Sequence, residues 1–170
     1  LALSARFTAK ESVNELLTVR NEIVFGTSSG LFVLNKKSGA YKKINFFKEL
    51  NIQSLEFSGD FYLIGTKDDG LYRTYTDFTS LEKIYSLPYS SNRIPITGIS
   101  HDRSGNFYVA TKGDGLYGLD KNLKFIEHYL ADDNSLSLSD NHLIGLYLDK
   151  FNTLYVSTET GQINSLNLRE

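Results

Sequence analysis

The sequence predicts an all-β protein, a β-propeller array of about four four-stranded blades, on three observations. Aromatic residues are frequent (11 Tyr and 11 Phe), only two of the 170 residues are Pro, and Thr followed closely by Gly recurs four times. The recurring Thr residues are Thr27, Thr66, Thr111 and Thr158. They are separated by 39, 45 and 47 residues, and a strand-rich period in the forties is typical of propeller blades.

Each copy has the pattern of one blade, and the third copy shows it most clearly. Pro95 to His101 is predicted as the inner strand, and Asn106 to Thr111 as the second strand after a turn that contains Gly105. Gly115 to Leu119 and Lys124 to Leu130 are predicted as the third and outer strands. Alternation and turn residues therefore indicate four antiparallel strands in sequence order.

The whole chain, residues 1–170, is interpreted as one propeller segment. After the third strand of the last copy, Gln162 to Leu168, the chain has no outer strand, whereas Ala2 to Thr8 alternates like one. We therefore expect residues 2–8 to complete the last blade. The approximate blades are residues 9–50, 51–94, 95–139 and 140–170.

Two segments also fit a helical interpretation. Glu11 to Arg20 has the pattern of an amphipathic helix capped by Ser12, and Asn45 to Leu50 fits a helical turn. The propeller interpretation instead requires a strand in the first segment.

A glycine closes the turn between the second and third strands of every copy. A tight hairpin at this place needs a residue with positive φ, which glycine adopts without steric cost. The four glycines are Gly30, Gly70, Gly115 and Gly161.

The third copy carries a resemblance to a known family. Ile96 to Thr111, followed by Gly115-Leu116-Tyr117, resembles the two-component regulator propeller repeat, with its Asp, Gly-Asn turn and apolar strand before Thr. Asn134-Ser135-Leu136-Ser137 is similar to the linker between blades of that family. The Trp of the family pattern is absent, and Tyr108 holds its place in this copy. The resemblance implies the extracytoplasmic sensor of a hybrid histidine kinase, with glycan fragments as typical signals.

Two other propeller families are excluded by their motifs. WD40 blades carry a Trp-Asp pair and kelch blades an adjacent Gly pair, and the chain has no Trp and no Gly-Gly.

Composition excludes several other classes of function. Lys plus Arg (18) nearly balances Asp plus Glu (20), so we expect no nucleic-acid partner. No apolar run approaches the 18 or more residues that span a bilayer, and we expect no membrane contact in this segment. Cys is absent, and His101, His128 and His142 lack the spacing of a metal motif. We expect no catalytic residues, no metal and no cofactor.

Two glycine motifs imitate catalytic or cofactor signatures. Gly26 to Gly30 matches G-x-S-x-G, and Gly113 to Gly118 matches G-x-G-x-x-G. Both signatures need a helix after a strand, whereas strands are predicted on both sides of each motif here. We interpret both as hairpin turns.

The candidate ligand site comes from topology. Turns between second and third strands, together with the linkers between blades, emerge at one end of a propeller, where binding residues are commonly placed. Arg, Asn, Asp and Tyr suit the hydroxyl groups of sugars, and the linkers add Tyr89, Asn92, Asp132, Asp133 and Asn134. Ordinary solvated turns have the same composition, which is the competing interpretation. The candidate ligand-binding residues are Lys67, Asp68, Asp69, Arg93, Lys112, Asp114 and Glu159.

These observations lead to one expected function and two alternatives. We expect a periplasmic ligand-sensing segment of a two-component sensor, without enzyme activity, that recognises a small oligosaccharide and passes the signal to a histidine kinase. The alternatives are a structural or protein-interaction propeller and a propeller lyase. The open blade edges predict a homo-oligomer, in the form of a dimer that combines two four-blade arrays. The alternative is a monomer in which residues 2–8 close a four-blade ring within their own chain.

Overall fold

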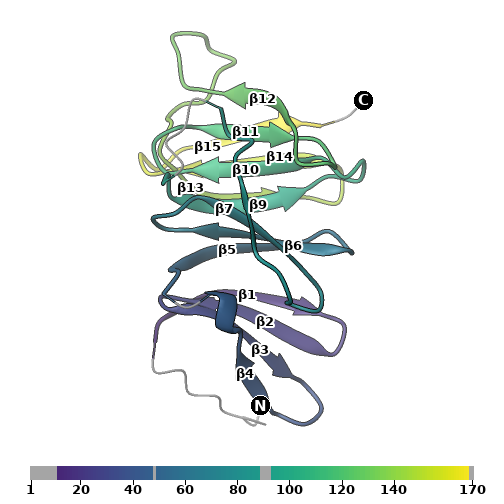
Figure 1. Cartoon of the computed structure of the whole chain (residues 1–170). Coiled ribbons are helices and arrows are strands. Elements are labelled where there is room, and N and C mark those ends of the chain that lie inside the picture. The colour runs from purple at the N-terminus through teal and green to yellow at the C-terminus, as the bar shows by residue number, and fades with distance from the viewer. Residues whose placement is uncertain (1–10, 48, 89–92, 169–170) are drawn as a thin grey trace, which may run out of the picture.

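The computed structural model describes residues 11–47, 49–88 and 93–168 and contains four antiparallel sheets stacked face to face (Figure 1). The first sheet contains β1 (Val13–Val19), β2 (Glu22–Thr27), β3 (Gly30–Asn35) and β4 (Tyr41–Lys43). The second contains β5 (Ile52–Phe57), β6 (Phe61–Thr66), β7 (Leu71–Tyr75) and β8 (Glu82–Ile84). The third contains β9 (Ile96–His101), β10 (Phe107–Thr111), β11 (Leu116–Leu119) and β12 (Phe125–Tyr129). The fourth contains β13 (Leu143–Leu148), β14 (Thr153–Thr158) and β15 (Ile163–Asn167).

Strands within every sheet follow sequence order, as the blade pattern predicts. We call the four sheets blades 1 to 4. The expected all-β propeller array is confirmed, and each predicted strand of the third copy is found within one residue of its predicted ends. The expected strand at residues 2–8 lies outside the described residues, within which blade 4 has three strands.

Of the two segments with a helical alternative, one is a strand. Residues 13–19 form β1, which pairs with β2 from Val13 opposite Thr27 to Val19 opposite Glu22. Asn45–Phe47 does form a short 3-10 helix, η1, which places Phe47 in the core.

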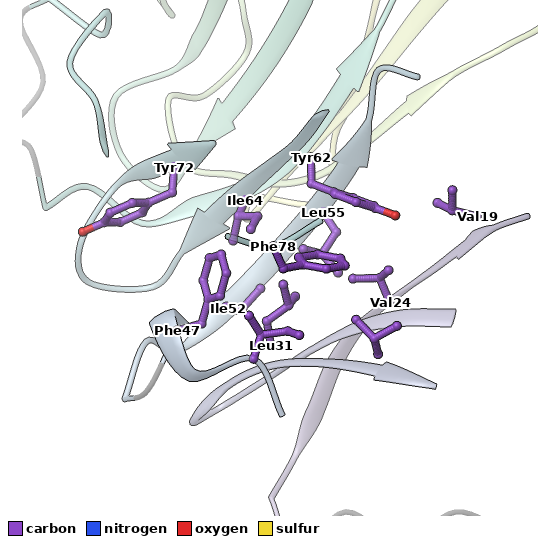
Figure 2. Close-up of a cluster of buried hydrophobic side chains, with 12 residues drawn as sticks. Val19, Val24, Leu31, Phe47, Ile52, Leu55, Tyr62, Ile64, Tyr72 and Phe78 are labelled. Carbon is purple, nitrogen blue, oxygen red and sulfur yellow. The ribbon is translucent and has the colours of Figure 1, made fainter. Parts of the chain in front are cut away.

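The core consists of three apolar clusters, one at each boundary between neighbouring blades. Figure 2 shows the first of them, where Val24 and Leu31 of blade 1 pack toward Ile52 and Ile64 of blade 2. Contacts between inner strands join β1 to β5, β5 to β9 and β9 to β13. Within the described chain the blades therefore form an open array, with blades 1 and 4 at opposite ends (Figure 1).

Close packing between blades explains the small residue before Thr in the second strand. A Cβ atom added at Gly26 would lie 2.3 Å from Cγ2 of Ile52, and one added at Gly65 would lie 2.5 Å from Cγ2 of Ile96. Real Cβ atoms do not come this close to other carbons. The glycine thus lets the inner strand of the next blade approach the sheet.

Candidate functional site

Four hairpin turns lie beside the starts of the inner strands, at one end of the molecule. Backbone N–H groups tie each turn to the start of its own blade: Lys67 N donates to Asn51 O at 2.8 Å, and Lys112 N donates to Pro95 O at 3.0 Å. Ser28 and Glu159 make the equivalent bonds. We call this end the turn face and define it by Ser28, Ser29, Lys67, Asp68, Asp69, Lys112, Asp114, Glu159 and Thr160.

A buried threonine anchors each turn. The hydroxyl of Thr66 donates to the carbonyl of Gly70 at 2.8 Å, and that of Thr111 donates to the carbonyl of Gly115 at 2.7 Å. Thr27 and Thr158 make the corresponding contacts, with Gly30 and Gln162. All four threonines are buried, and the four turn glycines have positive φ as predicted, between 67° and 138°. The turns are therefore held on a fixed scaffold.

In blade 2 the turn is also tied to the outer strand through a carboxylate. Nζ of Lys83, on β8, lies 2.5 Å from Oδ1 of Asp69, and the hydroxyl of Tyr72 donates to the same carboxylate. The Lys83 ammonium also lies over the Tyr72 ring, 5.5 Å from its centroid. The hydrogen bond from Lys83, followed by that from Tyr72, lowers the pKa of Asp69. Burial and the bonded Asp69 raise the pKa of Tyr72, so the tyrosine stays a hydrogen-bond donor.

Blade 3 repeats this arrangement with a histidine in place of the lysine. The Tyr117 hydroxyl lies 2.5 Å from Oδ2 of Asp114, and the His128 ring stacks on the Tyr117 ring with centroids 4.0 Å apart. Nε2 of His128 lies 2.7 Å from the carbonyl oxygen of Asp114. In blade 1 the equivalent contact joins Nζ of Lys43 to Oγ of Ser29 at 3.3 Å.

The repeated contact is thus a turn residue, an aromatic ring and a base on the outer strand. The aromatic residue and the base lie directly opposite each other in β3 and β4, in β7 and β8, and in β11 and β12. Sequence reasoning missed this set, although aligning the outer strands of the copies would have placed Lys43, Lys83 and His128 in one column.

The seven candidate ligand-binding residues fall into three groups. Asp69 and Asp114 are engaged within their own blades, as described above. Lys112 and Glu159 connect blades 3 and 4 through an ion pair of 3.0 Å between half-exposed side chains. Lys67, Asp68 and Arg93 are exposed, and the charge of Arg93 contributes to the lowered pKa of Asp69.

Metal ligation has no support among the described side chains. No group of three or more His, Asp or Glu residues gathers there. The three histidines lie apart in the fold: His101 contacts Glu56, His128 contacts Asp114 and His142 contacts Asp140.

Blade 4 borders a groove that sequence reasoning did not predict. Its volume is about 490 Å³, and it lies between the end of β12, the linker that follows and the strand β15. The linker residues Asp132 and Asn134 line it, while Asp133 does not. The full lining is His128, Tyr129, Leu130, Asp132, Asn134, Ser135, Leu136, Ser137, Leu138, Asn164, Ser165 and Leu166.

Comparison with solved structures shows which proteins share the fold. The extracellular domain of BT4673 from B. thetaiotaomicron, described both as a putative one-component and as a putative hybrid two-component system, superposes with a TM-score of 0.75 at 19% identity. The alignment covers 91% of this chain and 21% of that domain. The expected likeness to sensor propellers is therefore confirmed at the level of the fold, over about a fifth of the length of the relative.

Two further structures share the fold. PorZ, an essential surface component of the type-IX secretion system of Porphyromonas gingivalis, gives a TM-score of 0.74 at 16% identity over 92% of this chain and 26% of PorZ. The computationally designed protein Ika4 gives 0.68 at 13% identity over 99% of this chain and 96% of Ika4.

Sequence comparison identifies the family. No curated protein matches the chain. Residues 18–168, however, match the model of the Pep3/Vps18/deep orange β-propeller domain. This match contains β2 to β15 and the last two residues of β1. With its four stacked blades and buried turn threonines, the chain belongs to the Pep3/Vps18/deep orange β-propeller domain family.

Proposed function

We propose that this chain is a ligand-recognition segment of an extracytoplasmic sensor and binds its ligand at the turn face without catalysing a reaction. The observation that carries the proposal is that charged side chains from three consecutive blades lie at one end of a rigid scaffold. Lys67, Lys112 and Glu159 belong to blades 2, 3 and 4 and are all exposed. Binding groups on loops above a fixed framework are a common arrangement in recognition proteins.

The ligand class follows from the chemistry of these groups. Ammonium and guanidinium groups donate hydrogen bonds and carboxylates accept them, which matches the paired donor and acceptor character of sugar hydroxyls. We therefore propose an oligosaccharide, recognised by Lys67, Asp68, Arg93, Lys112 and Glu159. Asp69 and Asp114 hold the turns in place beneath these residues through Tyr72 and Tyr117.

Location and signalling complete the proposal. The BT4673 neighbour is an extracellular domain, and no helix in the described part of this chain is long and apolar enough to cross a bilayer. We propose that the segment works in the periplasm, in a sensor that passes its signal to a histidine kinase.

Binding to a panel of oligosaccharides, measured by titration calorimetry, tests the proposal. The wild-type chain is expected to bind at least one member. Lys112→Ala together with Glu159→Ala is expected to weaken that binding about 100-fold, since each lost charged hydrogen bond contributes about 1.5 kcal/mol and about 3 kcal/mol corresponds to two factors of ten. Lys121→Ala is the matched control, because Lys121 lies in the turn between β11 and β12, at the other end of blade 3. Failure to bind any sugar, or equal losses in the control, would contradict the proposal.

A second candidate function is protein interaction. The face of blade 4 that points away from blade 3 exposes Tyr147 and Ile163 at 67% and 74%. Large exposed apolar side chains on one sheet are typical of interaction surfaces. Pull-down with and without sugar distinguishes the two functions.

A further inference from the structure

A cavity lies between blades 1 and 2, at the end of the molecule opposite the turn face. Its volume is about 360 Å³, which lies within the range of small-molecule sites. The turn between β1 and β2, the end of β3, the hairpin of β5 and β6 and the residue after β7 surround it. Two neighbouring blades therefore build its walls.

A buried hydroxyl group faces this cavity. Tyr62, on β6, is 2% exposed, and its ring packs against Phe57 and Phe78 with centroids 4.7 and 5.2 Å apart. The Tyr62 hydroxyl has no hydrogen-bond partner among the described residues. Figure 2 shows it pointing out of the apolar cluster on the side of Val19, which lines the cavity together with Tyr62. Burying a polar group without a partner costs free energy, so the hydroxyl is an open contact point for a ligand.

Packing between blades does not require this hydroxyl. Tyr62 stands three residues before Gly65, the small residue that precedes the turn threonine. The residues at the same place in the other three copies are all apolar: Ile23, Phe107 and Leu154. The hydroxyl is therefore a feature of this cavity and not of the blade pattern.

Two opposite charges line the same cavity without pairing. Arg20 and Glu22 flank Asn21 in the turn between β1 and β2, and neither forms an ion pair within the described part of the chain. Both charges act on the Tyr62 hydroxyl. Burial and the charge of Glu22 raise the pKa of Tyr62, and the charge of Arg20 opposes that rise. Because the pKa is raised, the hydroxyl keeps its proton at neutral pH and can donate it in a hydrogen bond.

The turn that carries the two charges is tied to the end of β3. Nζ of Lys36 donates to the carbonyl oxygen of Arg20 at 2.9 Å, and the Lys36 N–H donates to that of Asn21 at 2.9 Å. Nδ2 of Asn21 donates to Oδ1 of Asn35 at 3.3 Å. This wall of the cavity is thus ordered before a ligand binds, which reduces the entropic cost of binding.

We propose that this cavity binds a small zwitterion of the class of free α-amino acids. The ligand carboxylate contacts the Arg20 guanidinium and the Tyr62 hydroxyl, and the ligand ammonium contacts the Glu22 carboxylate. Guanidinium groups match carboxylates in geometry and charge, and an ammonium group has only donors to offer a carboxylate. An uncharged sugar would leave both protein charges without a counter-charge. The proposal goes beyond the ligand function of the turn face and is independent of it, because the two sites lie at opposite ends of the blades.

Titration calorimetry with a panel of the common protein amino acids tests the site. The wild-type chain is expected to bind at least one of them, and Tyr62→Phe is expected to weaken that binding about tenfold through the lost hydrogen bond to a charged group. The midpoint of urea unfolding should not fall in Tyr62→Phe, since the hydroxyl has no partner to lose in the free chain. Tyr85→Phe is the matched control, because it removes a hydroxyl from an exposed tyrosine outside the cavity.

Derivatives of the bound amino acid test the two charges separately. Its amide lacks the carboxylate and its N-acetyl form lacks the ammonium, and each is expected to bind about tenfold more weakly. Glu22→Gln should weaken binding of the free amino acid but not of the N-acetyl form, and Arg20→Gln should weaken binding of the free amino acid but not of the amide.

Four results would overturn the proposal. They are the absence of binding by any amino acid, equal binding by wild type and Tyr62→Phe, and equal binding of the free amino acid and both derivatives. The fourth is binding of an uncharged sugar that Tyr62→Phe abolishes, which would assign the cavity to neutral hydroxyl compounds.

Discussion

The hydroxyl of Thr111, a fully buried residue at the end of β10, donates to the carbonyl oxygen of Gly115 and accepts from the N–H of Asp114 at 3.1 Å. Replacing Thr111 by Val keeps the shape and removes both bonds. We expect the free energy of unfolding to fall by about 1 to 2 kcal/mol, measured by urea titration. Thr111→Ser, which keeps the hydroxyl, is expected to lose less, and the reverse order would contradict the anchoring role.

Gly115 and Gly161 show two different reasons why a turn needs glycine: a positive φ, and the absence of space for a Cβ atom. Both have positive φ, 67° and 83°, but a Cβ added at Gly115 would lie 2.2 Å from the carbonyl oxygen of Tyr129, whereas one added at Gly161 meets nothing within 4 Å. Gly161→Ala should therefore cost only the left-handed backbone strain, about 1 kcal/mol. Gly115→Ala should cost about 1 to 3 kcal/mol more, because the outer strand has to move. Equal losses in urea titration would show that β12 does not pack against this turn.

At the scale of the elements, a contact between two titratable side chains joins the inner strands of blades 2 and 3. Nδ1 of His101 on β9 lies 3.1 Å from Oε1 of Glu56 on β5. The hydrogen bond that His101 donates to Glu56 raises the pKa of His101, and partial burial opposes that rise. Because the pKa is higher in the folded than in the unfolded chain, the pair stabilises the fold fully below the unfolded value of about 6.5 and loses this effect as the pH rises through the folded value.

A pH series of urea titrations measures this effect. The stability difference between the wild-type chain and His101→Gln is expected to shrink between about pH 6 and pH 8. Glu56→Gln removes the carboxylate and should abolish most of the dependence. A difference that grows with pH would show that His101 is neutral at this contact.

Strand order could be predicted from sequence because the Thr and Gly positions repeat in every copy. The helical alternative for residues 11–20 failed for a physical reason: in β1, Leu17 packs on the core between blades 1 and 2 while Leu16 points to the other face, 63% exposed. The pairing of β1 with β2 makes this segment a strand, and the local sequence pattern carries no information about that pairing. The Lys112 and Glu159 pair was equally out of reach, since 47 residues separate its members and only the packing of blade 3 on blade 4 brings them together.

At the scale of the whole molecule, each blade contributes to clusters shared only with its neighbours. Such an array resembles repeat proteins, whose stability is a sum of unit and interface contributions. The second strands show the difference along the array: five of the six residues of β6 are buried, but only three of the six of β14. Blade 4 is covered on one face, whereas blades 2 and 3 are covered on both.

Native-state hydrogen exchange is expected to reveal this gradient in the monomeric chain. Amides of β14 should exchange at least tenfold faster than those of β6 and β10, because local opening of an end blade exposes less buried apolar surface than opening of an interior blade. Tenfold corresponds to about 1.4 kcal/mol in opening free energy, which is less than the stability lost when one large buried side chain is removed.

The same measurement at rising protein concentration then shows whether the end blade acquires a neighbour. Protection of β14 should increase while that of β6 stays constant, since association stabilises only the elements that it covers. Uniform exchange across β6, β10 and β14 at low concentration would mean that the four blades unfold as one cooperative unit, in which case the open end face costs the array no local stability.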